Sequence, residues 1–468
     1  MDPRHDEVAC LAPHVALRFS PNGAVHACCV NDGFPLGRVG EQSLPAIWQG
    51  RPVARLRDAL DRGDHSLGCR DCGVQHAAGQ RRHTHAVAFD RFPRPARPLP
   101  WPKRVEFALS NACNLECVMC NGDLSSSIRA HVEGRPPLPR AYGDAFFEEL
   151  APLLAHVEVA VFIGGEPFLS PECRRVWDLL LEAGLAPEVH VTTNGTIWND
   201  RVEHYLRALR MNVAMSIDGV SAAVNESIRV GSRHAEVLAN RDRILEVTRS
   251  YGGGFGLNFC LLRRNWHELD AFLQEADRLD VDVHVIPVHY PRAESLFAAP
   301  ADELRRVVDA LDAATVVLGR NAGVRSAMVA SLRDRLERLE RGTTVTITTA
   351  IEAEALDALR SQLTTWAGQE PVVVHAPRGV IADVEVPPWA GPLGLEGFEG
   401  RPLDSLDEEL APRLGPRVNL EIEGGDAGYY TVQYDHDQPT GAVTFRSVVI
   451  PDWGVMTATR AEALAVRS

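Results

Sequence analysis

The sequence of 468 residues has few basic side chains and no long apolar stretch. It has 48 Lys and Arg against 63 Asp and Glu, Lys103 is the only lysine, and the net charge at pH 7 is -15. Nucleic-acid binding depends on clustered cations that neutralise phosphates, so a nucleic-acid partner is not expected. No apolar run approaches the roughly 20 residues that a helix needs to cross a bilayer, so no membrane span is expected either.

The beginning of the sequence, MDPRHDEVACLAP, lacks the basic segment followed by an apolar one that marks a secretory signal. We therefore expect a cytoplasmic protein. Cysteines in a reducing compartment serve burial, reactivity or metal binding rather than disulfides. The ten cysteines form a group before residue 81, a trio at Cys113, Cys117 and Cys120, and two separate thiols, Cys173 and Cys260, interpreted as buried core residues.

Short apolar runs alternate with amphipathic ones between residues 104 and 318, a pattern that builds a parallel sheet from strand and helix units. Strands are predicted at RVEFALS, VEVAVFI, EVHVTT, NVAMSI, FGLNFCLL and VDVHVIPV. Between them apolar residues recur at helical spacing, as in Phe146, Phe147, Leu150 and Leu154. Such units fit either a doubly wound sheet or an incomplete barrel of the triosephosphate isomerase type.

Composition divides the rest of the chain into three parts. Residues 1–80 hold five cysteines, and residues 81–103 form a segment rich in proline and arginine that is predicted to be a linker. Residues 319–468 begin with the helical stretch SLRDRLERLERG, pass through TTVTITTA and a second predicted helix, and then become rich in strand-forming residues. We expect this last part to be an α+β accessory domain, with a faint likeness to PAS-type domains.

Each of the first four predicted barrel strands is followed by a motif whose residues could bind a ligand or take part in a reaction. CNLECVMC follows the first strand, GGEP (164–167) the second, TTNGT (192–196) the third and SIDG (216–219) the fourth. The loops at the carboxyl ends of parallel strands form the site in such folds. We therefore expect the four motifs to share one pocket.

The cysteine trio, spaced CxxxCxxC, can hold a zinc ion or three irons of a 4Fe-4S cluster. A structural zinc site normally has four protein ligands, and the sequence offers no fourth ligand nearby. A cluster held by three cysteines leaves one iron open to a substrate or cosubstrate.

With these motifs in this order, residues 105–318 resemble the radical S-adenosylmethionine (radical SAM) enzymes. The resemblance implies an incomplete (β/α)6 barrel whose trio, Cys113, Cys117 and Cys120, binds a 4Fe-4S cluster. The open iron would chelate the amino and carboxylate groups of SAM, and the reduced cluster would cleave SAM to methionine and a 5'-deoxyadenosyl radical. Met119 stands where many members carry an aromatic residue, and it would cover the cluster with apolar atoms.

The resemblance also implies which residues bind SAM. They come from the three later motifs and from ESIRVGS, and they are Gly164, Gly165, Glu166, Asn194, Ser216 and Arg229. The two glycines would let backbone approach SAM closely, and Glu166 would accept a hydrogen bond from its ammonium group. Asn194 and Ser216 would bind ribose or carboxylate. Arg229 would pair with the carboxylate. Asp218 could orient its loop; the alternative for Asn194 and Asp218 is that each stabilises a turn before glycine.

The cysteines of the first 80 residues resemble the SPASM and twitch auxiliary-cluster domains that accompany many radical SAM enzymes. The matching residues are the thiols of a Cx12Gx4C segment and of a later CxxC pair, namely Cys10, Cys28, Cys69 and Cys72. The resemblance implies a second 4Fe-4S cluster with four thiolate ligands, suited to passing electrons. Zinc is the alternative occupant, and Cys29 is interpreted as a neighbour of the ligand Cys28. PNGAV between them predicts a hairpin turn.

The sequence thus predicts a radical SAM oxidoreductase that abstracts hydrogen from a peptide or protein and completes an oxidation, crosslink or epimerisation. The auxiliary cluster would relay electrons, and a flavodoxin or ferredoxin would be the electron donor. The alternatives are a dehydrogenase of a small carbohydrate or amino-acid-derived metabolite, and a non-enzymatic redox or SAM sensor. His289 and Tyr290, after the last predicted barrel strand, are the predicted substrate-side groups, and no catalytic acid or base is identified.

Overall fold

The computed structural model describes residues 9–31, 33–65, 67–69, 72–73, 76, 81, 84–289 and 291–341, together with six strands beyond residue 343. The chain divides into two compact units. The first is built from the chain up to Cys29, from Leu36–Asp58 and from Ala86–Leu336, and the second from Val30–Pro35, Ala59–His85 and Glu337–Ser468. No helix in the described part of the chain combines the length and apolarity needed to cross a bilayer.

Six parallel strands form the centre of the first unit and neighbour one another in chain order. They are β4 (Arg104–Phe107), β5 (Val159–Phe162), β6 (Glu188–Thr193), β7 (Asn212–Ser216), β8 (Phe255–Leu261) and β9 (Asp282–Pro287). Buried and half-buried residues alternate along β6 and β7, as expected for strands with one face on the core. The predicted incomplete barrel is confirmed.

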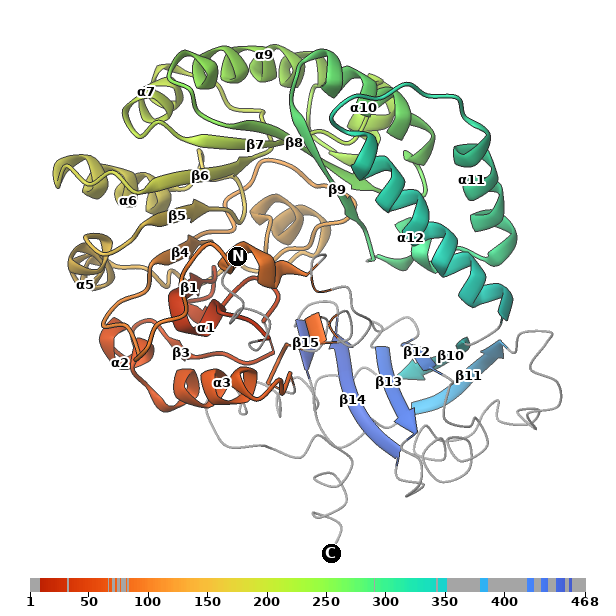
Figure 1. The fold of residues 1–468 in the computed structure, drawn as a ribbon, viewed down its shortest axis with the longest axis horizontal. Coiled ribbons are helices and arrows are strands. Elements are labelled where there is room, and N and C mark those ends of the chain that lie inside the picture. The colour runs from red at the N-terminus through yellow and green to blue at the C-terminus, as the bar shows by residue number, and fades with distance from the viewer. Residues whose placement is uncertain are drawn as a thin grey trace, which may run out of the picture. The chain divides into compact units, whose positions relative to one another are not determined.

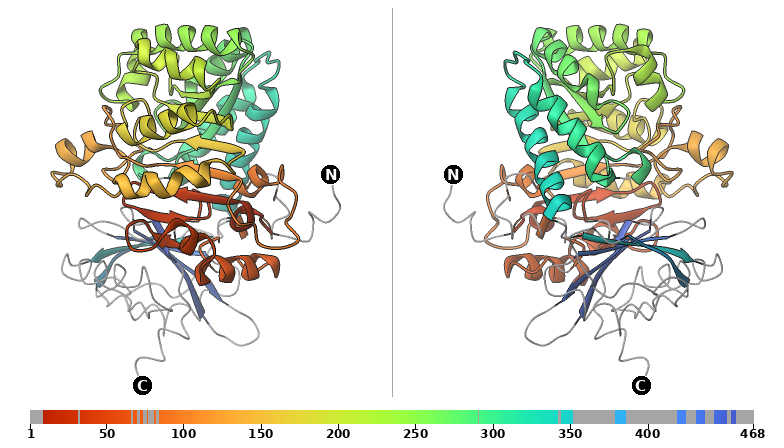
Figure 2. Two further views of the ribbon diagram at one scale, coloured as in Figure 1. Left: turned by 90° about the vertical axis from the view of Figure 1, so that its left-hand side faces the viewer. Right: turned by 90° about the vertical axis from the view of Figure 1, so that its right-hand side faces the viewer.

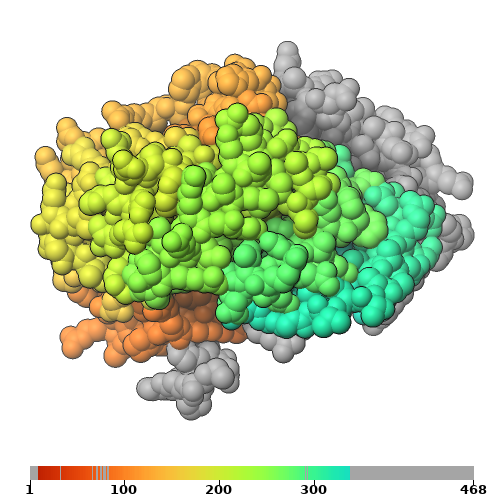
Figure 3. Space-filling model, turned by 90° about the horizontal axis from the view of Figure 1, so that it is seen from above, coloured from red at the N-terminus to blue at the C-terminus, as the bar shows by residue number. Residues whose placement is uncertain are grey.

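Helices lie on the outer side of the sheet, where those up to α10 connect successive strands and the last two follow β9 (Figure 1). They are α5 (Asp144–Leu154), α6 (Pro171–Glu182), α7 (Asp200–Ala208), α8 (Ala222–Ile228), α9 (His234–Ser250), α10 (Leu269–Arg278), α11 (Ala301–Ala313) and α12 (Ala322–Arg341). The right-hand view of Figure 2 shows α11 and α12 at the β9 end of the sheet. Seen from above, the helical layer forms a continuous surface from yellow through green to teal residues (Figure 3). Parallel neighbours require such crossovers, and helices supply them.

Short irregular helices fill several of the connections in the first unit. They are the 3-10 helices η5 (Trp266–Glu268), η6 (Arg292–Glu294) and η7 (Leu296–Ala298), and the π-helical turn η4 (Ile128–Val132). The η4 turn follows the cysteine loop directly, and π-helical turns occur frequently at functional sites.

Three N-terminal strands extend the same sheet beyond β4. They are β1 (Ala16–Phe19), β2 (Ala24–His26) and β3 (Gly37–Arg38), and the full order is β3-β2-β1-β4-β5-β6-β7-β8-β9. The strands β1 and β2 form an antiparallel pair around the sequence PNGAV, so the predicted hairpin turn is confirmed. In contrast, β1 pairs with β4 in parallel. The hairpin of the cysteine-rich region is therefore part of the barrel sheet.

The register of these strands aligns one aromatic row across the sheet. Phe19 lies opposite Phe107, and Phe107 lies opposite Phe162. Their ring centroids are 5.9 and 4.9 Å apart, and all three rings are fully buried. Stacked aromatic side chains bury large apolar areas and gain further from ring contacts. The row therefore ties β1 to the barrel core.

The remaining N-terminal elements of the first unit pack beside the hairpin. They are α1 (Ala12–Val15), α2 (Leu44–Trp48) and the first part of α3 (Arg51–Asp61). The Trp48 ring lies 4.5 Å from the Arg57 guanidinium, and its Nε1–H donates to the carbonyl of Leu99 at 2.8 Å. Leu99 belongs to the proline-rich segment, and Phe89 and Phe92 of this segment are also buried. The segment thus lies against the first unit.

The second unit contains two small sheets in its described part. One has the order β11-β10-β12 and the other the order β13-β14-β15. The strands are β10 (Thr344–Ile351), β11 (Gly379–Glu385), β12 (Asn419–Gly424), β13 (Thr431–His436), β14 (Val443–Ile450) and β15 (Gly454–Met456). The sequence TTVTITTA, for which no element was predicted, contributes β10, whereas the predicted helix near residues 353–366 lies outside the described residues.

Replacing Phe19 with Ala should destabilise the whole barrel sheet, because it removes one ring of the buried aromatic row. We expect the free energy of unfolding to fall by about 3 to 5 kcal/mol, as for other buried Phe to Ala changes. Urea unfolding measures this loss, and hydrogen exchange locates it. Exchange should accelerate in β4 as well as in β1.

The matched control is Val317→Ala, since Val317 is 85% exposed. Its effect should stay within about 0.5 kcal/mol. Faster exchange that is confined to residues 9–40 in the Phe19 variant would contradict the integration of β1 into the barrel.

Candidate functional site

The cysteine trio lies on the loop that follows β4, and its thiols are half-buried. Burial raises the pKa of Cys117 to about 11 and that of Cys120 to about 12, and Cys113 lies close enough to raise both further. Burial also raises the pKa of Cys113, although hydrogen bonds to its sulfur oppose this. Metal binding to such thiols must displace their protons.

Backbone pairing fixes the middle of the cysteine loop. The N–H of Glu116 donates to the carbonyl of Val230 at 2.8 Å. The N–H of Val118 donates to the carbonyl of Ile228 at 2.9 Å. These two bonds resemble one step of an antiparallel ladder, so Cys117 lies opposite the residue between Ile228 and Val230. That residue is Arg229.

Apolar side chains of the same loop anchor it to the core. Val118 and Met119 pack against a buried cluster of Ile228, Leu262 and Val288. Met119 thus contributes to an apolar wall beside the cysteines. This agrees with the covering role that the sequence assigned to it.

The two glycines of GGEP let the loop after β5 lie directly on the cysteine loop. Gly164 has φ +87, in the left-handed region that favours glycine. A Cβ on Gly165 would lie 2.4 Å from the carbonyl oxygen of Ala112. The N–H of Glu166 donates to that same oxygen at 2.7 Å. The close approach that glycine permits here is therefore to the protein's own backbone.

Glu166 is buried, at 1% exposure, and its carboxylate is occupied by neighbouring donors. The N–H of Asn194 donates to it at 2.7 Å, the N–H of Phe168 at 3.1 Å and the hydroxyl of Thr193 at 2.9 Å. Burial raises the pKa of Glu166 to about 7, although these hydrogen bonds lower it. The Glu166 side chain thus links the GGEP loop to the TTNGT loop. The sequence had predicted only a contact of Glu166 with the SAM ammonium group.

The Asn194 side chain joins the TTNGT loop to the cysteine loop. Its Nδ2 donates to Oδ1 of Asn114 at 3.1 Å and approaches the Cys113 sulfur at 3.9 Å. Its Oδ1 accepts from the N–H of Thr196 at 2.9 Å. The turn-stabilising alternative is therefore present in the structure, and Asn114 is a contributor that the sequence interpretation missed. The predicted contact of Asn194 with SAM stays a prediction.

Arg229 and Asp218 form a buried ion pair at the carboxyl end of β7. Nε of Arg229 lies 2.7 Å from Oδ2 of Asp218, and the two side chains are 8% and 0% exposed. No hydrogen bond within the described residues involves the two terminal nitrogens of Arg229. Ser216 is the last residue of β7 and is half-buried. It shortly precedes Asp218 in the sequence. The open fork of Arg229 has the geometry that binds a carboxylate.

Cys260 also belongs to this region, contrary to its interpretation as an ordinary core thiol. It is half-buried on β8 and packs against Ile228 and Leu262. Burial raises the pKa of its thiol, and the charges of Asp218 and Arg229 also act on it. The apolar run around Cys260 gave no sign of this proximity, because the pairing of β7 with β8 creates it. Cys173, in contrast, is fully buried in α6, as expected.

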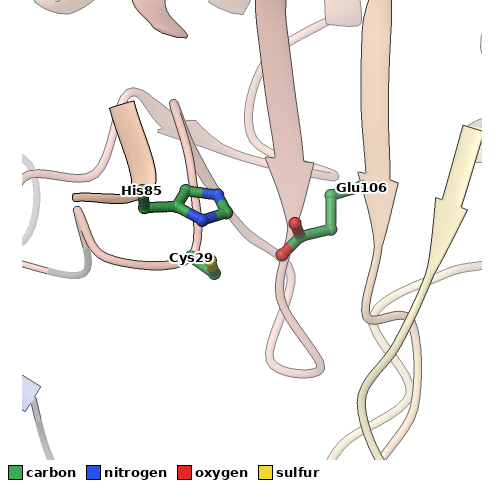
Figure 4. A group of neighbouring side chains, drawn as sticks. All are labelled: Cys29, His85 and Glu106. Atoms are coloured by element: carbon green, nitrogen blue, oxygen red, sulfur yellow. The ribbon is translucent and has the colours of Figure 1, made fainter. Parts of the chain in front are cut away.

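A second charged group lies on the sheet face opposite the aromatic row. Nε of Arg18 lies 2.8 Å from the Glu106 carboxylate, and both side chains are buried. The Cys29 sulfur lies within 4.8 Å of a carboxylate oxygen of Glu106 (Figure 4, where His85 is also labelled). Burial lowers the pKa of Arg104, and the charges of nearby Glu106 and Cys29 oppose this lowering. Cys29 is thus placed among charged side chains.

The predicted auxiliary cysteines are divided between the two units. Cys10 and Cys28 belong to the first unit, where the Cys10 sulfur accepts from the N–H of Ala12 at 3.4 Å. Cys69 and Cys72 belong to the second. Burial raises the pKa of Cys69 to about 12, while a hydrogen bond from Asn31 at 3.0 Å lowers it. The ligand set of these four thiols stays a prediction.

The predicted substrate-side residues follow β9. His289 is exposed, and its ring lies 5.1 Å from that of Phe297. Tyr290 lies outside the described residues. The role of both stays a prediction.

Two family profiles match the chain. The radical SAM superfamily matches residues 107–276, and the SPASM iron-sulfur cluster-binding domain matches residues 10–73. Residues 107–276 are thus a radical SAM domain, and residues 10–73 are a SPASM domain. Members use a 4Fe-4S cluster and SAM, and the SPASM domain carries auxiliary iron-sulfur clusters. The predicted N-terminal position of the auxiliary domain is confirmed.

Curated relatives and solved structures of radical SAM proteins are similar over part of the chain. An AdoMet-dependent heme synthase of Methanosarcina barkeri is 27% identical over 206 residues, which cover 43% of this chain and 55% of the relative. The mycofactocin maturase MftC of Mycobacterium tuberculosis is 30% identical over 198 residues, 40% of this chain and 45% of the relative. The chain thus matches about half the length of each. A structure of Streptococcus suis SuiB shows 15% identity and a TM-score of 0.33, covering 52% of this chain and 50% of that one.

The residues present fit the radical SAM cluster. Three half-buried cysteines lie on one loop, and an apolar wall and a buried arginine lie beside this loop. The residues that would hold the cluster are Cys113, Cys117 and Cys120, and the open fork of Arg229 is the feature that fits the SAM carboxylate.

Replacing any one cysteine of the trio with Ala should lower the iron content of the reconstituted protein. We expect about eight irons per chain in the wild type, for two 4Fe-4S clusters, and about four in each variant. Anaerobic reconstitution followed by iron and sulfide analysis measures this. Cys173→Ala is the matched control and should retain the wild-type iron content. Unchanged iron in all three trio variants would contradict the assignment.

Replacing Glu166 with Gln should destabilise the protein, because an amide N–H₂ would then face buried donors. We expect the free energy of unfolding to fall by about 1 to 3 kcal/mol, measured by urea unfolding. The exposed Glu182→Gln is the control and should change stability by less than about 0.5 kcal/mol. A Glu166 variant with wild-type stability and greatly weakened SAM binding would instead support a direct contact with the SAM ammonium group.

Proposed function

We propose that this protein abstracts hydrogen from a peptide or protein substrate and completes an oxidation, a crosslink or an epimerisation. When bound, the cluster and SAM supply methionine and a 5'-deoxyadenosyl radical, which takes a hydrogen atom from the substrate. The observation that carries this proposal is the convergence of the cysteine trio, the GGEP loop and Arg229 at one edge of the barrel sheet.

The protein's own residues have distinct tasks in this scheme. The terminal nitrogens of Arg229 bind the SAM carboxylate, and Ser216 at the end of β7 contributes a hydroxyl to the same pocket. Glu166 and Asn194 hold the surrounding loops at fixed distances through their hydrogen bonds. The wall that includes Met119 keeps water away from the thiolates.

A peptide substrate is favoured by the resemblance to radical SAM enzymes with auxiliary domains, many of which modify ribosomally made peptides. One curated relative is named a mycofactocin maturase. Loss of one electron to the auxiliary cluster and of one proton would complete a two-electron oxidation after hydrogen abstraction.

A small-molecule substrate is the second candidate. The heme synthase of Methanosarcina barkeri matches a similar length of the chain at 27% identity, and its name describes no peptide. A flavodoxin or ferredoxin would donate electrons in either case.

Two assays test the proposed function together. The anaerobically reconstituted protein, given SAM and dithionite, should form 5'-deoxyadenosine, detected by liquid chromatography. Co-expression with short peptides encoded beside its gene should then change a peptide mass, by loss of two hydrogens for an oxidation or crosslink. An epimerised peptide would instead gain one deuterium when made in heavy water.

The Cys117→Ala variant is the control and should give neither product. Formation of 5'-deoxyadenosine without any change in the peptides would favour the small-molecule alternative. Absence of 5'-deoxyadenosine from protein with full iron content would favour a sensor without catalytic activity and would contradict the proposal.

A further inference from the structure

Asp218 is fully buried, and hydrogen bonds together with one ion pair hold it in place. Its N–H donates to Oδ1 of Asn225 at 2.9 Å, and its carbonyl accepts from Nδ2 of Asn265 at 2.9 Å. Its Oδ1 accepts from the N–H of Cys260 at 2.6 Å, and its Oδ2 faces Nε of Arg229 at 2.7 Å. A carboxylate with all of these partners has a single orientation.

Two buried asparagines, Asn225 and Asn265, hold the backbone of Asp218 and of its neighbours in place. Asn225 is fully buried, and its backbone carbonyl accepts from the N–H of Arg229 at 2.7 Å, while its side chain accepts from Asp218. Asn265, also fully buried, donates to the carbonyls of both Asp218 and Cys260. The ends of β7 and β8 and the end of α8 are thus joined around one carboxylate.

We propose that Asp218 is a positioning residue that aims Arg229 at the SAM carboxylate and holds it beside the cysteine loop. The proposal rests on the SAM-binding role of Arg229 in the proposed function. The carboxylate occupies Nε, which leaves the two terminal nitrogens, the pair that forms a bidentate fork, for a ligand. Since Arg229 lies opposite Cys117 in the backbone pairing, an orientation fixed by Asp218 is also fixed relative to the cluster ligands.

The physical reason is preorganisation. An arginine side chain has many rotamers, and ordering them on binding would weaken affinity. A buried guanidinium without a counter-charge would also be strongly unfavourable, so the fork could not remain inside the barrel alone. Asp218 reduces both the rotamer ordering and the unpaired buried charge before SAM binds, because it neutralises the guanidinium and holds it in one orientation.

Asp218→Asn is the direct test, since it keeps the shape and an acceptor for the Cys260 N–H but places a neutral group against Nε. We expect the reconstituted variant to bind SAM about tenfold to a hundredfold more weakly, the range for losing a charge-assisted hydrogen bond. The measurement is a SAM titration of the electron paramagnetic resonance spectrum of the reduced cluster, without any peptide. Wild-type SAM affinity in an Asp218→Asn variant with full iron content would overturn the proposal.

A double-mutant cycle separates positioning from general stability. If Asp218 acts through Arg229, then the double variant Asp218→Asn with Arg229→Gln should bind SAM no more weakly than Arg229→Gln alone. The double variant leaves no unpaired buried charge, so it should take up iron even where Asp218→Asn alone fails to do so. A further loss of affinity in the double variant would overturn the proposal. The proposal would also be overturned if both single variants took up iron and the double variant did not, because Asp218 would then act independently of Arg229.

Asp270→Asn is the matched control. It also removes the carboxylate of an arginine ion pair, with Nε of Arg325 at 2.5 Å, but between α10 and α12. It should leave the SAM titration unchanged. Failure of the proposed function has a different signature, because wild-type protein would then bind SAM in the same titration and modify no peptide.

Discussion

The geometry of the site depends on contacts between different loops. The cysteine loop has almost no regular structure, and its position comes from neighbours: the backbone of residues 228–230, the carbonyl of Ala112 against GGEP, and the side chain of Asn194. Parallel strands bring these loops to the same edge of the sheet, because the carboxyl ends of all six strands point one way. The geometry of a metal site is therefore set by the register of β4 to β8.

The N-terminal hairpin shows how an auxiliary domain that precedes the barrel can be joined to it. The parallel pairing of β1 with β4 places Phe19 in register with the barrel aromatics and Arg18 in register with Glu106. One face of β1 is thus held by ring stacking and the other by an ion pair. A flexible tether would satisfy neither contact. Residues 10–29, which include two predicted cluster ligands, are in this way fixed relative to the radical SAM barrel.

Sequence alone predicted the barrel, the hairpin turn and the family, because these depend on local patterns: apolar alternation, turn residues and the spacing of motifs. It did not predict the partners of Glu166, since Thr193 and Asn194 meet that carboxylate only through the register of β5 with β6. The parallel strand at residues 16–19 was missed for a similar reason. Its four residues are buried on both faces and show no alternation, so only pairing with β4 identifies their position.

Two buried ion pairs lie near the site. Arg18 with Glu106 and Arg229 with Asp218 are both paired at 2.7 to 2.8 Å inside the first unit. The cysteine thiols have no such partner of their own, and burial accordingly raises their pKa values. Thiolates become stable there only when metal replaces the protons. Burial raises the pKa of Cys117 and the charge of Arg229 opposes this effect, while Asp218 neutralises that charge within the same ion pair.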